Sequence, residues 1–297
     1  MTAGSDNLVS AFEAERRRLL HRHWLRALLG LVVASLVLGF SFHQSRFFDP
    51  EIGENPFGRI LEFVGRMAPR LSGDVLFEGR GVDGSLASWF YDLPGWLAAL
   101  WETIEIALVS TVLGSLAAVL ASFLCARNLM PWAPVRFVVR RLLEAIRTLP
   151  DLVMALILVA AFGAGATAGV ITLSIATLGG LGKLFAEINE EVDPKQLEML
   201  DASGAGLISK IRFGVLPQVL ANYASYVLLR LEINVAAAGA LGIVGAGGIG
   251  LELQRAITYT EFSTYLAILL LMVCVIFLID MTSEAIRNNL LLQTDSR

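Results

Sequence analysis

The sequence predicts an all-α, polytopic membrane protein with six transmembrane helices, on two observations. Of its 297 residues, 56% are hydrophobic and 17% charged, and the mean hydropathy is +0.67, which is too apolar for a soluble globular protein. Several apolar runs also approach or exceed the ~20 residues that span a bilayer. The alternating pattern of a barrel strand is absent, so these runs must satisfy their backbone groups as helices.

The predicted spans follow a basic N-terminal segment, residues 1–24. The first span is 25–42; because it is long and no A-x-A-like cleavage site follows it, an uncleaved span is favoured over a secretory signal peptide. Residues 43–96 form a polar loop with five arginines and eight acidic residues, whose glycines and prolines allow only short helices. The remaining spans lie at about 97–125, 136–162, 168–189, 217–241 and 262–286.

Charge sets the orientation of these spans. Arginines concentrate between the second and third spans, and with the basic N-terminus they place both segments in the cytoplasm by the positive-inside rule. Counting onward, 190–216 and the tail 288–297 also lie inside, whereas 43–96 and 242–261 lie outside. Both termini are then cytoplasmic in a multi-pass protein. The arginines are Arg127, Arg136, Arg140, Arg141 and Arg147.

Composition also limits what the chain binds. A net charge of −4 carries no nucleic-acid signature. Cys125 and Cys274 lie far apart inside apolar runs, with no metal-ligand spacing, so both are expected to be buried thiols, and no metal site is predicted.

The segment 190–216 is a polar insert between two spans, and its start reads as a helix cap. Asp193 can accept hydrogen bonds from free backbone N–H groups, Pro194 suits the first helical position, and Gln196 falls at the capping-box position. The pattern predicts a short helix that runs to Ala202 or the residue after it.

The rest of this insert predicts a turn and a second short helix. Gly204 and Gly206 can take the left-handed conformation that ends a helix. Residues 207–213 then form another short helix, and Pro217 opens the fifth span, where its missing N–H is tolerated. The product is a helix–turn–helix knob; the alternative is a solvated loop with two caps.

The spacing of this insert resembles the signature of ABC-importer permeases: Glu-Ala-Ala, three residues, Gly, nine residues, a hydrophobe, one residue and Leu-Pro. Glu198, Gly204 and Leu216-Pro217 fall in register, whereas Met199, Leu200 and Gly214 depart from it. Flanking segments are similar to the phosphonate-type branch of this family, and the resemblance covers about residues 97–287. These segments are Arg147-Thr-Leu-Pro-Asp151, Leu181-Gly-Lys-Leu-Phe-Ala-Glu187, Phe213-Gly-Val-Leu-Pro-Gln218 and Leu241-Gly-Ile-Val-Gly-Ala-Gly-Gly-Ile-Gly250.

The resemblance implies the MetI-like fold of a type I importer permease in the bacterial cytoplasmic membrane. Two copies of the chain would form the pore as a homodimer, surrounded by membrane lipid. Two ATPase subunits, which bind ATP and magnesium, would dock on the knob, and an extracytoplasmic binding protein would deliver a phosphonate, phosphite or phosphate ester. The chain itself would be no enzyme and hold no cofactor. The ATPase-coupling positions would be Glu198, Ala202, Gly204, Leu216 and Pro217.

Three polar residues lie near the middle of the fifth span. Arg230 and Asn234 share one helix face, whereas Glu232 points away from both. Ionisable groups at this depth cost ~2.5–3.5 kcal/mol each, so they face a pore or a partner. One reading is that they pair with other helices as packing contacts. The other places them on the translocation pathway, where one arginine and amide donors would suit an anion.

Residues at two other places are candidates for the pathway or a gate. Thr148, Pro150 and Asp151 lie at the predicted cytoplasmic entry to the third span, where Pro150 should kink or restart the helix and Asp151 could stabilise the new N-terminus. They read either as a helix boundary or as a hinge. The glycine-rich loop 242–250 reads either as a tight loop or as a gate-lining turn whose N–H groups meet an anion. Its candidate positions are Gly245, Gly247, Gly248 and Gly250.

Two nucleotide-binding motifs are only formal matches. Residues 245–250 fit G-x-G-x-x-G, but a membrane span replaces the strand that must precede it. Gly182-Lys183 lacks the rest of a P-loop, and Lys183 with Glu187 reads as a surface pair. An active transporter without its own ATPase motif must borrow one. The rival functions are a permease for methionine, another amino acid or another oxyanion; an ion-driven secondary transporter; and a membrane-embedded enzyme.

Overall fold

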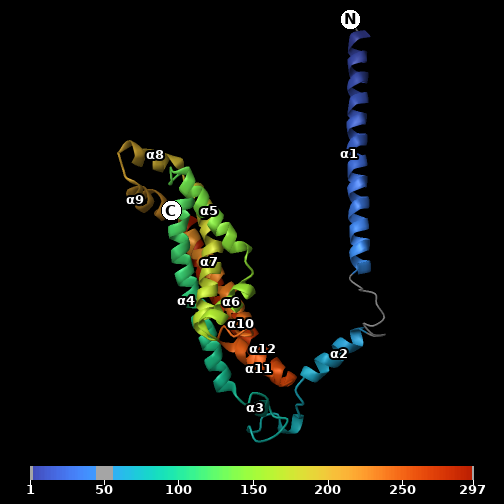
Figure 1. Ribbon diagram of the computed structural model, residues 1–297, viewed down its shortest axis with the longest axis vertical. Coiled ribbons are helices and arrows are strands. Elements are labelled where there is room, and N and C mark those ends of the chain that lie inside the picture. Colours follow the sequence, from blue (N-terminus) through green and yellow to red (C-terminus); the bar gives the residue numbers. More distant parts are fainter. Residues whose placement is uncertain (1–2, 45–55, 296–297) are drawn as a thin grey trace. The chain divides into compact units, whose positions relative to one another are not determined.

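The computed structural model describes residues 3–44 and 56–295, and within them every regular element is a helix (Figure 1). The chain divides into two compact units, residues 1–65 and 66–297. The elements are α1 Ala3–Gln44, α2 Pro56–Met67, η2 Gly73–Val75, α3 Leu86–Trp89, α4 Leu93–Cys125, α5 Ala133–Thr148, α6 Asp151–Phe162, α7 Ala166–Glu190, α8 Pro194–Ala202, α9 Leu207–Ser209, η3 Lys210–Val215, α10 Leu216–Gly242, α11 Ile249–Thr258 and α12 Phe262–Asp295.

The first unit contains the long helix α1. Its stretch from His23 to Gln44 is long and apolar enough to cross a membrane, and every side chain there is exposed. The predicted span 25–42 lies wholly within it. Apolar side chains exposed along a whole helix are expected to face lipid, because water would disfavour them.

Four predicted spans of the second unit are confirmed as helices of sufficient length and apolarity. They are α4, α7, the continuous helical stretch Leu207–Gly242 that contains α10, and α12. In its described part, from residue 56 onward, the polar loop before α4 carries only short helices, as its glycines and prolines predict. Its Trp89 Nε1 donates a hydrogen bond to the carbonyl of Ser263, 2.9 Å away, which ties the loop to the start of α12.

The third predicted span, 136–162, corresponds to two helices separated by a break at Pro150. These helices, α5 and α6, meet at an angle of 89°. Leu149 is extended because the α conformation is disfavoured before a proline, and Pro150 has no N–H to continue the ladder. The predicted restart at Pro150 is therefore confirmed. With 12 residues, α6 rises ~18 Å, too little to cross a bilayer alone.

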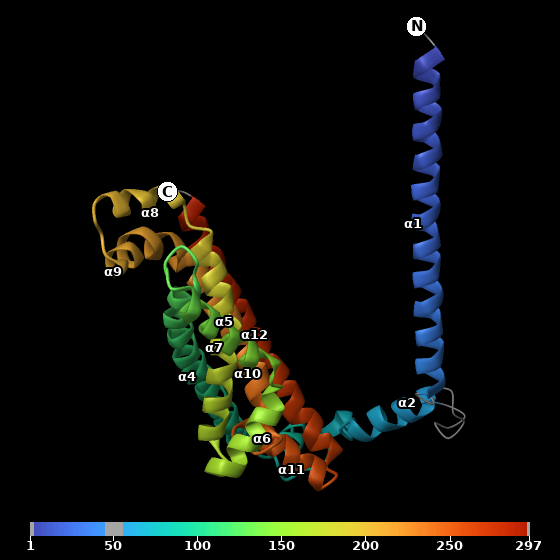
Figure 2. The same ribbon diagram turned by 45° about the horizontal axis from the view of Figure 1, so that its top comes forward.

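The second unit is a helical bundle in which α4, α7 and α10 pack together (Figure 1). One end of the bundle holds α8, α9 and the α4–α5 connection, and α12 ends there too; α3, α11 and the α6–α7 turn gather at the other end (Figure 2). Within the second unit, the segments that the arginine distribution assigns to the cytoplasm thus lie at one end of the bundle.

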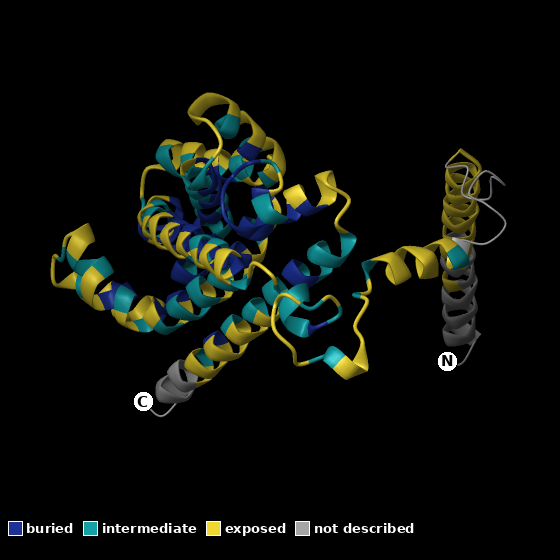
Figure 3. Cartoon of the chain, turned by 90° about the horizontal axis from the view of Figure 1, so that it is seen from below, coloured by how far each residue is buried: buried dark blue, intermediate teal, exposed yellow. Residues whose placement is uncertain are grey.

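Close packing in the bundle depends on small residues of α4. A side chain at Gly114 would meet Thr177 Cβ at 2.5 Å and the Ser174 carbonyl at 2.6 Å, so only glycine lets α4 and α7 approach this closely. Buried residues gather between the packed helices (Figure 3). Cys125 is among them, but Cys274 is exposed on the outer side of α12, so the expectation of two buried thiols is wrong for Cys274.

Candidate functional site

The start of α8 is capped as the sequence predicts, with one difference. The Asp193 carboxylate accepts a hydrogen bond from the backbone N–H of Lys195 at 3.0 Å. Gln196 does not close a capping box; its side-chain oxygen accepts from Gln218 Nε2 at 2.9 Å, and Gln218 Oε1 accepts from the Asp193 N–H at 3.3 Å. Gln218 of α10 therefore takes the capping-box role and ties α8 to the root of α10.

The turn after α8 confirms one predicted glycine conformation and contradicts the other. Gly204 has φ +76°, a left-handed value that ends α8, and the Ala205 N–H bonds to the Leu200 carbonyl at 3.0 Å. Gly206 has φ −71° and is extended, so its expected left-handed conformation is wrong. An ion pair between Lys210 and Asp201 closes the knob, residues 193–216.

The predicted short helix over 207–213 is present, but it runs into α10 without a break. It begins as α9 and widens into η3, a π-helix. The widened stretch lies directly before Pro217, which cannot donate a backbone hydrogen bond. Gln218 Nε2 supplies a donor there to the Gly214 carbonyl at 2.7 Å. The knob is thus rigidly continuous with the spanning helix.

Two departures from the family pattern compensate each other in space. A side chain at Gly214 would meet Leu200 Cδ1 at 2.9 Å and Leu197 Cδ2 at 3.1 Å. Leu200 stands where the signature has alanine, and Gly214 stands where it has a hydrophobe. The larger residue on α8 therefore fills the space left by the smaller residue on η3.

The predicted coupling positions are presented on the surface of this knob. Leu197 is buried and holds α8 against the bundle, so that the opposite face of α8 is free. Glu198, Ala202, Gly204 and Pro217 are exposed and Leu216 is half-buried. Large apolar side chains are exposed beside them, at Met199, Ile208 and Phe213. A free face with this composition can dock a partner protein.

A buried hydrogen-bond network anchors the root of the knob. Tyr223 of α10 donates its hydroxyl to Asn189 Oδ1 at 2.7 Å, and Asn189 Nδ2 donates to Ser122 Oγ of α4 at 3.1 Å. The Tyr223 ring stacks on Phe185 with centroids 4.0 Å apart. Asn189, Ser122 and Phe185 are wholly buried, so the network joins α4, α7 and α10 where the knob begins.

Arg230 and Asn234 share one face of α10, as predicted, and both contact Thr177 of α7. Arg230 Nε donates to Thr177 Oγ1 at 3.2 Å, and Asn234 Nδ2 donates to Thr177 Oγ1 at 2.9 Å and to Thr111 Oγ1 of α4 at 2.8 Å. Asn234 is wholly buried, and its Oδ1 has no partner among the described residues. A line of hydrogen-bonded polar side chains from α4, α7 and α10 thus crosses the interior of the bundle.

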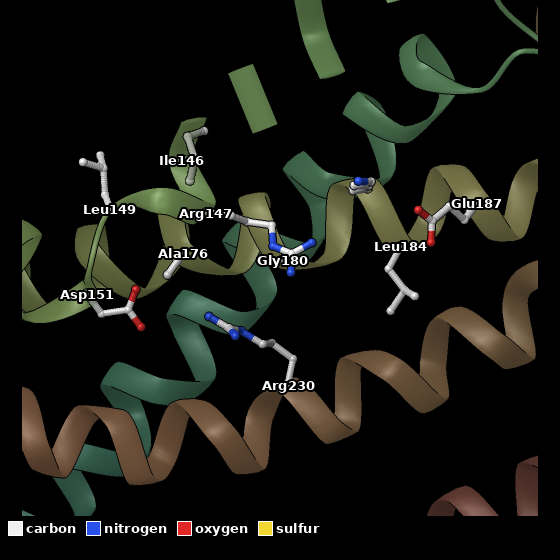
Figure 4. A pocket seen from close by; sticks show the side chains of 10 residues that line it. Ile146, Arg147, Leu149, Asp151, Ala176, Gly180, Leu184, Glu187 and Arg230 are labelled. Atoms are coloured by element: carbon white, nitrogen blue, oxygen red, sulfur yellow. The ribbon is translucent and has the colours of Figure 1, made fainter. Parts of the chain in front are cut away.

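A cavity of about 470 Å³ lies beside this line, among α5, α6, α7 and α10 (Figure 4). Arg230 and Asp151 reach into it from opposite sides, level with Gly180 in the middle of α7. The break between α5 and α6 lies beside the middle of α7, and the expected position of Asp151 at the cytoplasmic entry to the span stays a prediction. The other lining residues are Ile146, Arg147, Leu149, Ala176, Lys183, Leu184 and Glu187.

The remaining polar candidates do not line this cavity. Thr148 donates its hydroxyl to the Ala145 carbonyl at 2.7 Å and is exposed at the end of α5, and Pro150 is exposed at the break. Glu232 is half-buried and faces α12, where Asp280 and Ser283 are its neighbours. It therefore points away from Arg230, as the helix geometry predicts.

The four candidate glycines form a buried corner rather than an open turn. Gly245, Gly247 and Gly248 have positive φ, and these three and Gly250 are all buried. Gly247 and Gly250 lie closest to backbone atoms of other residues. The N–H of Ile249, at the start of α11, donates to Thr103 Oγ1 of α4 at 2.8 Å. This N–H is therefore already satisfied, and a role of the corner in a gate stays a prediction.

Sequence reasoning missed the residues that connect these features. The missed residues are polar and lie inside or beside long apolar runs: Thr111, Thr177, Asn189, Gln218 and Tyr223. All five lie within predicted spans, and a polar side chain in an apolar run is the signal that indicates such positions. Which of them meet depends on how the helices pack.

The fold defines a polytopic helical protein with a helical knob between two of its predicted spans. The comparisons name its family: residues 118–290 match the model of the binding-protein-dependent transport system inner membrane component, and the chain belongs to this family. Its fold is that of solved ABC importer permeases. It matches the inward-facing MetNI methionine ABC transporter with a TM-score of 0.58 and 19% identity, over 66% of this chain and 95% of that chain.

Two curated relatives transport phosphorus oxyanions. The chain is 36% identical to the phosphite transport system permease protein PtxC of Stutzerimonas stutzeri, over 67% of this chain and 73% of that protein. It is 35% identical to the phosphate-import permease protein PhnE of Mycolicibacterium smegmatis, over 64% of this chain but 36% of that protein. The sequence-based family assignment is thus confirmed.

Proposed function

We propose that this chain is the pore-forming permease of an ATP-driven, binding-protein-dependent importer for a phosphorus oxyanion. The observation that carries the proposal is the knob. Its capped helix presents Glu198 and Gly204 outward, while Gln218 and the buried network around Tyr223 tie its root to the spanning helices. A rigid knob of this kind transmits closure of an ATPase dimer to the helices that line the pore.

Each proposed partner accounts for a feature of the chain. Two ATPase subunits bind ATP and magnesium and grip the knobs on the cytoplasmic side, where both termini also lie. A binding protein delivers the ligand at the other end of the bundle. A second copy of the chain closes the cavity, whose lining residues Arg147 and Leu149 are exposed on a single chain. The chain itself hydrolyses nothing.

The ligand class is supported by charge as well as by the relatives. Arg230, Arg147 and Lys183 line the cavity beside Asp151 and Glu187, which makes the lining net positive by one charge. We place Arg230 and Asn234 on the translocation pathway, where guanidinium and amide donors match tetrahedral oxyanions.

The docking proposal is tested by co-purification. The tagged chain is expressed in its own host, extracted in a mild detergent, and the retained proteins are identified by mass spectrometry. We expect an ATPase subunit with a P-loop. Glu198→Arg should reduce its recovery at least tenfold, whereas the matched control Glu191→Arg, an exposed reversal just outside the knob, should not.

A functional, well-folded preparation without an ATPase subunit would contradict the proposal and favour an ion-driven transporter. The ligand is tested separately, by the stimulation of ATP hydrolysis when the cognate binding protein carries phosphite, methylphosphonate, phosphate or methionine. Stimulation by methionine alone would retain the importer and reject the phosphorus ligand.

A further inference from the structure

Four charged side chains line the cavity without an ion-pair partner in the described part of the chain: Arg147, Asp151, Glu187 and Arg230. Arg230 uses Nε for Thr177, and its two terminal amino groups have no hydrogen-bond or ion-pair partner in the described part of the chain. The side chains of Arg147 and Asp151 have none there either. In Figure 4 the Arg230 guanidinium and the Asp151 carboxylate point toward each other across the cavity.

The neighbouring arginines of α5 behave differently. Arg140 pairs with Glu190 at 2.5 Å, Arg141 pairs with Glu144 at 2.5 Å, and Arg136 donates to the Met130 carbonyl at 2.8 Å. Arg147 is thus the arginine of α5 whose side chain is left unpaired, and it is the one that lines the cavity. An unpaired guanidinium that lines a cavity is suited to receive an anionic ligand or a counter-ion.

The backbone around the cavity leaves room at Arg230. Gly180 lies under the guanidinium: a methyl group there would sit 3.7 Å from Arg230 Nη1, in ordinary contact, and a larger side chain would cover the charge. On the opposite side, Asp151 is the first residue of α6, after the break at Pro150. Its carboxylate is the charge that acts on Arg230 electrostatically, yet it forms no ion pair with it.

Building on the proposed function, we propose that Arg147 and Arg230 bind one tetrahedral oxyanion in this cavity, and that Asp151 is an internal anion that displaces it from Arg230. The oxyanion neutralises two guanidinium groups that are otherwise unpaired. A small movement of α6 toward α10 would bring the Asp151 carboxylate onto Arg230. Asp151 therefore lowers the affinity for the oxyanion and prevents the two arginines from trapping it.

The affinity on the cytoplasmic side can be measured with a sided assay. The importer, consisting of this chain with its ATPase subunits, is placed in proteoliposomes with the ligand-loaded binding protein enclosed and the ATPase subunits facing outward. ATP hydrolysis is then titrated with inorganic phosphite added outside. Asp151→Asn should lower the half-inhibitory phosphite concentration about tenfold. A carboxylate next to a site that binds an anion changes the binding equilibrium by about this factor. Asp151→Glu should resemble the unmodified protein.

Further variants separate displacement of the oxyanion by Asp151 from a general electrostatic effect of the carboxylates in the cavity. Glu187→Gln removes another carboxylate of the same cavity and should shift the half-inhibitory concentration less than twofold. Arg230→Gln should abolish inhibition, alone and combined with Asp151→Asn. An equal shift with Glu187→Gln, or no shift with Asp151→Asn, would overturn this displacement. A working importer that phosphite never inhibits, even as Asp151→Asn, would reject the site but not the importer. Hydrolysis that ignores the loaded binding protein would reject the importer itself.

Discussion

The contact between Leu200 and Gly214 predicts that two destabilising substitutions repair each other. Gly214→Leu places a side chain where Cβ alone would lie 2.9 Å from Leu200 Cδ1. Leu200→Ala removes that neighbour, and the double variant restores the size pattern of the family signature. The knob lies between the predicted spans 168–189 and 217–241, so energies measured in water are applied to it.

The magnitudes follow from the packing. Inserting a side chain at Gly214 costs roughly 1–3 kcal/mol of overpacking, offset by about 1 kcal/mol because glycine is a poor helix former. Leu200 is half-buried, so Leu200→Ala should cost roughly half of the ~2–5 kcal/mol of a core truncation. In the double variant the new leucine fills the space of the old one. The double variant should therefore be about 2 kcal/mol more stable than the sum of the singles predicts.

Hydrogen exchange measured by mass spectrometry on the purified importer gives this energy locally. Peptides from α8 and η3 report the free energy of opening the knob, and peptides from α11, at the other end of the bundle, serve as the internal control. Each single variant should speed exchange in the knob alone. Exchange in the double variant that equals the sum of the two single effects would show that Leu200 and Gly214 do not pack together, and the compensation would be refuted.

Three further predictions concern the bundle. Tyr223→Phe leaves Asn189 Oδ1 without its 2.7 Å donor and should cost about 1–3 kcal/mol, seen as a lower thermal midpoint of the importer; the exposed Tyr226→Phe is the control. Thr103→Val removes the acceptor of the Ile249 N–H and should speed hydrogen exchange in α11 by an amount worth about 0.5–2 kcal/mol, whereas Thr103→Ser should not. Gly114→Val should yield aggregated protein on size exclusion, because its Cβ would lie 2.5 Å from that of Thr177; at Gly30 nothing lies within 4 Å, so Gly30→Val should remain monodisperse.

Predictions from the sequence succeeded where the cause is local. Asp193 caps α8 because a carboxylate can reach an N–H two residues on, and Gly204 ends α8 because it can adopt positive φ. Pro150 restarts a helix because it lacks an N–H. The position of that break along α7 was not predictable in this way, since it depends on where α5 and α6 pack. Asp151 therefore lies opposite Arg230 across the cavity.

At the candidate site, contacts between residues far apart in the sequence were likewise not predictable from sequence patterns. The i, i+4 spacing of Arg230 and Asn234 placed them on one face of α10, but nothing in that spacing indicates that both donate to Thr177. Met199, Leu200 and Gly214 read as three separate departures from a motif, yet the last two are one packing arrangement. The missing capping box at Gln196 is supplied from α10.

Apolar run length, the distribution of arginines and the capping residues determined from sequence alone that the chain is a helical membrane protein with a knob between two spans. These properties depend on neighbours along the chain and on transfer of side chains from water to lipid. Only the tertiary structure decided the 89° bend between α5 and α6, and which polar groups remain unpaired in the cavity beside it. Those outcomes depend on distances between helices, which one chain's order of residues does not specify.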